Sequence, residues 1–99
     1  MRQGWFRASI ILKKRTMRIY EFTIRVEGID PDAADLEDRF YEAGCDDATI
    51  SVYDGNINIE FYRESNSLAA AIKSALKNVL SAGVTITTIF SEPEIYMDE

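Results

Sequence analysis

The sequence predicts an α+β fold in which four antiparallel strands form one sheet and two helices cover one face of it. Segments with the two-residue period of strands and segments with the period of helices follow one another in the order strand, helix, strand, strand, helix, strand. The dipeptide Asp54-Gly55, which two-residue hairpins prefer, joins the second strand to the third. With right-handed crossovers, this order is that of a ferredoxin-like βαββαβ domain.

The first strand and the first helix are predicted from alternation and from capping residues. The strand predicted at residues 18–27 alternates between apolar and polar side chains from Tyr20 onward, which is typical of a half-buried strand. Asp30 is expected to cap the helix that follows, Pro31 to lie in its first turn, and Gly44 to end it after about three turns.

The second and third strands are predicted over residues 48–53 and 56–63, and the last strand over residues 84–90. In the second strand, Ile50 and Val52 favour one register over a weaker alternative led by Tyr53. The residues predicted to face the helices are Tyr20, Phe22, Ile24, Val26, Ile50, Val52, Ile57, Ile59, Phe61, Val84, Ile86 and Phe90.

The second helix has two candidate caps, Ser65 and Ser67, and runs to about Ala82, where Gly83 ends it. Its apolar residues form a broad stripe that is expected to pack on the sheet. The stripe comprises Leu68, Ala71, Ile72, Ala75, Leu76 and Val79.

Charge divides the 99 residues into three parts: a basic arm (1–17), the ferredoxin-like domain (18–91) and an acidic tail (92–99). Six of the 11 basic residues and none of the 17 acidic residues lie in the first 18 positions, so residues 19–99 carry a net charge of −12. The arm is expected to contact the domain or to be solvated, with nucleic acid or an anionic surface as alternatives. Because Met17 precedes the first strand directly, an extension from an upstream start is a further alternative.

The open face of the sheet, on the side away from the helices, is the candidate interaction surface. It is predicted to show Ile19, Glu21, Thr23, Arg25, Thr49, Ser51, Tyr53, Asn58, Glu60, Tyr62, Thr85, Thr87 and Ile89. Uncharged Thr, Tyr and Asn suit a face that a second subunit covers, so we expect a homodimer through this face or through an edge strand, with a solvated monomer as the alternative. The contact residues are expected to be Thr23, Arg25, Thr49, Ser51, Tyr53, Tyr62, Thr85 and Thr87.

Catalysis and cofactor binding are not expected from these residues. The chain has no histidine, and its only cysteine, Cys45, lies at a helix carboxyl end, where the dipole raises a thiol pKa. Asp46 and Asp47 lack the ligand spacing of a calcium loop and are interpreted as turn residues at the entry to a strand. We therefore expect no enzyme activity, no metal and no cofactor.

Nucleic-acid and membrane binding are not expected either. Glu21 and Glu60 lie among the aromatic residues of the open face and would repel phosphates. No apolar segment approaches the ~20 residues that span a bilayer, and a lone cysteine fits a reducing compartment, so we expect a cytoplasmic protein. A rival hypothesis is a small-ligand sensor that binds at the loop formed by Glu27, Gly28 and Asp30.

Three segments together resemble a bacterial family of small ferredoxin-like domains: YEFTIRV at 20–26, EAGCDDATI at 42–50 and IEFYRESNSLAAAIKSALKNV at 59–79. The resemblance covers about residues 19–95, and the AGCDDA motif is its best marker. Longer relatives carry a carboxy-terminal helix-turn-helix, which implies a sensing or assembly role attached to DNA binding. This chain has EIYMDE where that segment would begin, so the expected partner is a separate helix-turn-helix protein, and no catalytic residue is implied.

Overall fold

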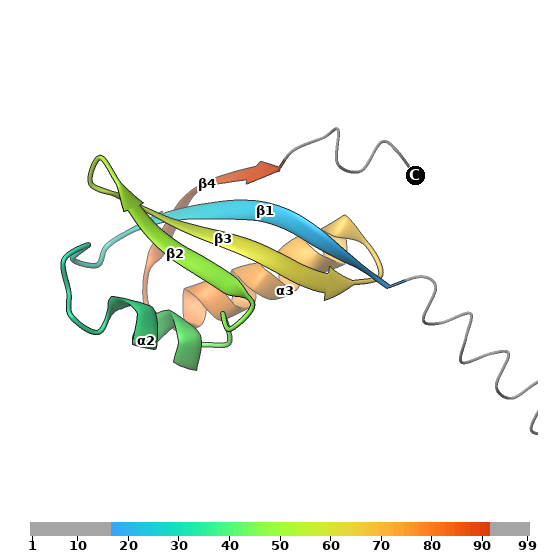
Figure 1. Ribbon diagram of the computed structural model, residues 1–99, viewed down its shortest axis with the longest axis horizontal. Helices are drawn as coiled ribbons and strands as arrows, with labels where there is room; N and C mark the ends of the chain where they lie inside the picture. The colour runs from blue at the N-terminus through green and yellow to red at the C-terminus, as the bar shows by residue number, and fades with distance from the viewer. Residues whose placement is uncertain (1–16, 92–99) are drawn as a thin grey trace, which may run out of the picture.

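The computed structural model describes residues 17–91, which form one four-stranded antiparallel sheet and two helices (Figure 1). The elements are β1 (Arg18–Glu27), α2 (Leu36–Glu42), β2 (Ala48–Tyr53), β3 (Asn56–Ser65), α3 (Leu68–Ser81) and β4 (Thr85–Ser91). The strand order is β2-β3-β1-β4, with both helices on the same side of the sheet. This arrangement confirms the predicted ferredoxin-like fold.

The core lies between the sheet and the helices, where the alternation of the strands predicted it. In β1 and β3, every second side chain is buried, and Phe22 stacks on Phe61 with ring centroids 5.3 Å apart. From α3, Ala71, Ala75 and Val79 pack down onto these strands and are fully buried. Ile50 pairs with Ile59 and Val52 with Ile57, which confirms the predicted register of β2.

Two local predictions are confirmed at the turns. Asp54 and Gly55 both have positive φ, 55° and 80°, as a type I′ hairpin requires. Ser67, rather than Ser65, caps α3, because its side-chain oxygen accepts a hydrogen bond from the backbone N–H of Ala70 at 3.0 Å.

The first helix is shorter than predicted and begins later. The carboxylate of Asp30 accepts a hydrogen bond from the backbone N–H of Asp32 at 3.0 Å, and Ala33 donates to the carbonyl of Asp30. These bonds close tight turns over residues 30–36 instead of a helical turn, because an aspartate side chain competes with the helix for nearby N–H groups. The seven-residue helix α2 therefore starts at Leu36.

The predicted facing of β4 is wrong beyond its middle. Val26 pairs with Ile86 but Arg25 pairs with Thr88, so Thr87 is an extra residue in β4, and the register shifts there. The shift exchanges the two faces: Phe90 pairs with Thr23 on the open face, and Ile89 pairs with Ile24 on the helix side. A bulge of one residue is invisible to an alternation rule, which placed these two side chains on the opposite faces.

Val52 has the predicted facing but remains exposed, and it lines a hollow together with Ile50 and the first residues of α2. Neither α2 nor α3 has the length and hydrophobicity needed to cross a bilayer. Of the predicted arm, only Met17 belongs to the described residues, and the predicted tail at 92–99 lies outside them.

Candidate functional site

Apart from Ile89, the open face of the sheet carries the residues that the sequence predicted for it. Thr23 lies in one row with Glu60 and Thr49, and Arg25 lies in the next row with Asn58 and Ser51. The remaining predicted contact residues follow from the same pairing: Tyr53 opposite Asn56, Tyr62 opposite Glu21, Thr85 opposite Glu27, and Thr87 at the bulge. The sheet therefore brings all eight predicted contact residues onto one face.

Large apolar and aromatic side chains are exposed on this face. The exposed fractions are 75% for Tyr53, 62% for Ile19, 43% for Tyr62 and 41% for Phe90. Ile19 and Tyr62 stand opposite Glu64 and Glu21, whereas Tyr53 and Phe90 stand opposite Asn56 and Thr23. No helix covers this face of the sheet (Figure 1). Tyr53 lies at the β2–β3 hairpin, away from Ile19 and Tyr62. Large apolar and aromatic side chains exposed on an uncovered face are typical of an interaction site.

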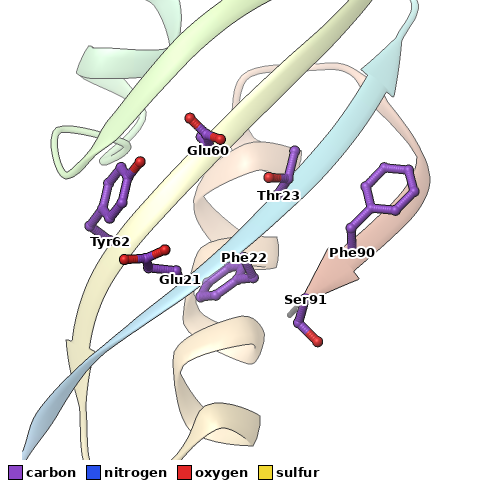
Figure 2. Close-up of a pocket in the computed structure, with 7 residues that line it drawn as sticks. All are labelled: Glu21, Phe22, Thr23, Glu60, Tyr62, Phe90 and Ser91. Atoms are coloured by element: carbon purple, nitrogen blue, oxygen red, sulfur yellow. The ribbon is translucent and has the colours of Figure 1, made fainter. Parts of the chain in front are cut away.

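A hollow of about 340 Å³ lies in the open face and is lined by Glu21, Phe22, Thr23, Glu60, Tyr62, Phe90 and Ser91. Figure 2 shows Tyr62 on one side and Phe90 on the other, with Glu21, Glu60 and Thr23 between them. Two aromatic walls and two carboxylates suit a cationic or aromatic group more than an anion. We call this surface the acidic hollow.

The charges of the acidic hollow act on Tyr62. The carboxylate of Glu60 raises the pKa of the Tyr62 hydroxyl, and burial, the charge of Glu21 and a hydrogen bond to Glu60 raise it further. Both carboxylates therefore lie close enough to Tyr62 to oppose the ionisation of its hydroxyl. Of the side chains that line the hollow, two are carboxylates and none is basic.

Phe90 is the residue of this site that sequence reasoning missed. The guanidinium of Arg25 lies 5.0 Å from the centroid of its ring, and Arg25 Nε also donates to Asn58 Oδ1 at 3.0 Å. The bulge is held by Thr87, whose hydroxyl donates to the carbonyl of Arg25 at 3.2 Å. In the sequence, the only sign of the bulge in β4 is the pair of adjacent polar residues Thr87 and Thr88, which interrupts the alternation of the strand.

The loop proposed for a ligand lies beyond the acidic hollow, between β1 and α2. Gly28 has φ of 93°, which favours glycine, and an added Cβ would meet the backbone N of Thr85 at 3.6 Å. The Asp30 carboxylate is occupied by the N–H of Asp32. The structure brings Glu27 beside Thr85 but does not join these residues to the hollow.

The AGCDD segment is organised by Arg63, a buried arginine that points from β3 toward α3. Its guanidinium forms two bonds to the Asp47 carboxylate, both 2.8 Å, and one to the carbonyl of Gly44 at 3.0 Å. The other two N–H groups donate to Asn78 Oδ1 at 2.8 Å and to Ser74 Oγ at 3.1 Å. All five donors of Arg63 are therefore used, and they join β3, α3 and the α2–β2 loop.

This cluster corrects the interpretation of Asp47 as only a turn residue. Its side chain is an acceptor for a buried cation 16 residues further along the chain. The hydrogen bond to Asp47 is the main cause that raises the pKa of Arg63, while burial acts in the opposite direction. Asp46 is exposed, which fits its predicted role in the turn.

Gly44 and Cys45 complete the end of α2. Gly44 has φ of 106° and donates to the carbonyl of Tyr41 at 3.1 Å, while Cys45 donates to that of Phe40 at 2.9 Å. This pair of bonds is a Schellman motif, which needs glycine at the left-handed position and an apolar residue after it. Burial raises the pKa of the Cys45 thiol to about 11, although the charge of Arg63 opposes part of the shift.

The thiol of Cys45 is expected to be unreactive in the folded protein. At pH 8 a thiol of pKa about 11 is almost wholly protonated, and only 2% of the residue is exposed. A disulfide reagent such as DTNB should therefore release one equivalent of chromophore in denaturant and almost none from the native protein. A rapid reaction of the native protein with DTNB at pH 8 would show that Cys45 is accessible and ionised.

Within residues 17–91, no three His, Cys, Asp or Glu side chains come together as a metal site would require. No family model, no curated protein and no solved structure matches this chain. The resemblance to a bacterial family and the expected helix-turn-helix partner therefore stay predictions.

Proposed function

We propose that this chain is a protein-association module that forms a homodimer through the open face of its sheet. The observation that carries the proposal is the group of four exposed apolar or aromatic side chains, Ile19, Tyr53, Tyr62 and Phe90, on a face that no helix covers. Tyrosine is enriched among residues that dominate binding energy, because it buries a large area at a low cost in conformational entropy.

The polar residues of the face support the same function. Thr49, Ser51 and Thr85 are exposed and uncharged, so they form hydrogen bonds across an interface without the desolvation cost of an ion. The buried ionic cluster around Arg63 lies on the other side of the sheet, and its donors are all used within the fold. The open face is thus the surface that is best suited to a partner.

The expected solution mass is twice the 11.3 kDa of one chain. Replacing Tyr53 and Tyr62 together by alanine should raise the dimer dissociation constant by at least about tenfold, since a tyrosine that dominates an interface contributes more than about 1 kcal/mol. Light scattering over a dilution series measures both quantities. A monomeric wild-type chain at micromolar concentration would contradict the proposal.

Tyr41→Ala is the matched control for this pair. Tyr41 is 65% exposed, but it lies on α2, on the helix side of the sheet. Its replacement removes an exposed ring of the same kind without touching the open face, so the dissociation constant should not change. An equal loss of association in this variant would place the interface on the helix side.

A further inference from the structure

The strand β2 forms one edge of the sheet and carries none of the features that usually keep a further strand away. Within residues 17–91, β2 has β3 on one side and no strand on the other. Its sequence, ATISVY, contains no charged residue and no proline, and its pairing with β3 runs without a bulge. Charges, prolines and bulges are the usual protection of sheet edges. The other edge strand, β4, is interrupted by the bulge at Thr87, so β2 is the edge better suited to a partner strand.

The backbone groups of Ile50 and Val52 point away from β3. The carbonyl of Asp47 accepts a hydrogen bond from the backbone N–H of Tyr62 at 3.0 Å, so residues 47, 49, 51 and 53 form the hydrogen-bonded pairs with β3. Residues 48, 50 and 52 therefore direct their N–H and C=O groups outward along the edge. These groups are the donors and acceptors that an added extended chain requires.

Two adjoining hollows, of about 290 and 410 Å³, lie between this edge and α2, and we call them together the α2–β2 groove. Both hollows include Ile50 and the exposed carboxylates of Glu37 and Asp38, which are the only charged residues that line either one. The apolar and aromatic side chains that extend the groove to its two ends are Tyr41 and Ala48 in the smaller hollow, and Leu36 and Val52 in the larger one. The groove is therefore acidic at its centre and apolar on both sides.

We infer that the α2–β2 groove binds an extended segment of a partner protein, which pairs with β2 as a fifth strand and carries an arginine or a lysine between two aliphatic residues. Because the side chains of a strand alternate, residues i, i+2 and i+4 of the segment face α2. The basic residue at i+2 then lies beside Glu37 and Asp38, and each aliphatic residue enters one hollow. The inference goes beyond the proposed dimer and does not depend on it, because the groove lies at the edge and on the helix side of the sheet.

A second copy of β2 suits this groove less well than a basic segment does. Antiparallel pairing of two β2 edges places the α2 helices of both copies on the same side of the joined sheet. The carboxylates of Glu37 and Asp38 would then face the same carboxylates of the other copy. The β2 strand contains no basic residue that could compensate them, and like charges across an interface are unfavourable.

The acetylated and amidated peptide TVTRTVT is a probe with this pattern, and a nuclear magnetic resonance titration of the full, ¹⁵N-labelled chain measures its binding. Chemical shifts should change in α2 and β2. At saturating peptide, amide hydrogen exchange should slow severalfold at Ile50 and Val52, whose N–H groups point outward, and change less at Thr49 and Ser51, which are bonded to β3. Two control peptides should bind at least about tenfold more weakly. One has glutamate in place of the arginine, and the other keeps every side chain but is methylated at the backbone nitrogens of its three central residues.

The variant Glu37→Gln/Asp38→Asn should weaken binding of the arginine peptide about tenfold and reduce its advantage over the glutamate peptide. Its matched control, Glu42→Gln/Glu64→Gln, removes two exposed carboxylates that line neither hollow and should leave the affinity unchanged. Circular dichroism of both variants verifies that the fold is retained.

The remaining outcomes overturn the inference. They are an absence of shift changes at millimolar peptide, equal binding of the arginine and glutamate peptides, and shift changes confined to the open face. Slow exchange at Ile50 and Val52 without peptide that becomes faster on dilution would show that a second copy occupies the edge instead. Light scattering of the same samples separates the two proposals. A monomer that binds the peptide contradicts only the dimer, and a dimer that does not bind it contradicts only this inference.

Discussion

Replacing Arg63 by alanine is expected to lower the free energy of unfolding by about 3 kcal/mol. The substitution leaves the Asp47 carboxylate, the Gly44 carbonyl and the Asn78 amide oxygen without their donor. It also removes the guanidinium that lies 4.9 Å from the centroid of Phe61. The value is placed at the low end of the range for a broken buried ion pair, because the Asp47 side chain is 31% exposed and can be partly rehydrated.

Urea denaturation followed by circular dichroism measures this loss, and two variants define its origin. Asp47→Asn keeps the shape of the acceptor but removes its charge, so it should cost less than Arg63→Ala. Arg39→Ala is the control: Arg39 is an exposed arginine with a single bond of 3.0 Å to the carbonyl of Ala82, and its loss should cost under about 1 kcal/mol. Equal effects of Arg63→Ala and Arg39→Ala would contradict the role assigned to the cluster.

Replacing Gly44 by alanine is expected to lower the free energy of unfolding by about 2–4 kcal/mol. At φ of 106° an L-residue is strained, and the added Cβ would lie 2.6 Å from Asn78 Nδ2. Asn78 cannot move away without cost, because its Oδ1 accepts a hydrogen bond from Arg63 at 2.8 Å. The same denaturation experiment measures the loss.

The double variant Gly44→Ala/Asn78→Ala separates the two causes. If the clash contributes, the double variant should be destabilised by less than the sum of the two single variants. Additive effects would leave backbone strain as the whole cause. Gly55→Ala is the control for the clash. Its φ is also positive, but an added Cβ meets nothing within 4 Å, so this variant carries the backbone strain without the clash.

The elements that the sequence predicted correctly are those that local chemistry decides. Asp54-Gly55 determines the hairpin because both residues must adopt positive φ, and Ser67 caps α3 with its own side chain. Alternation in β1 and β3 is strict, so the buried face and the open face follow from it.

The elements that were missed depend on contacts between distant residues or on one added residue. Asp47 and Arg63 are 16 positions apart, and neither side chain indicates its partner in the sequence. The bulge at Thr87 changes the facing of Ile89 and Phe90, which moved one aromatic side chain into the candidate site. The Asp30 carboxylate serves a turn instead of a helix cap, which shortened α2 at its start.

The AGCDD segment, the best marker of the suggested family, thus has a structural explanation. Gly44 ends a helix and Cys45 fills the space behind it, while Asp47 and the Gly44 carbonyl bind Arg63. Arg63 itself belongs to the FYRE stretch that carries the same resemblance. Two parts of the proposed signature are therefore halves of one buried cluster, while the proposed function lies on the opposite face.

Cysteine cross-linking tests the dimer through the open face most directly. Cys45 is buried and its thiol is protonated at neutral pH, so a single cysteine introduced elsewhere is the only reactive one among the described residues. Thr49→Cys and Ser51→Cys place it on the open face, and Lys77→Cys places it on the exposed side of α3. A short bismaleimide should convert the two open-face variants to covalent dimers and leave Lys77→Cys monomeric on a denaturing gel. Dimers in Lys77→Cys with none in the open-face variants would contradict the proposed interface.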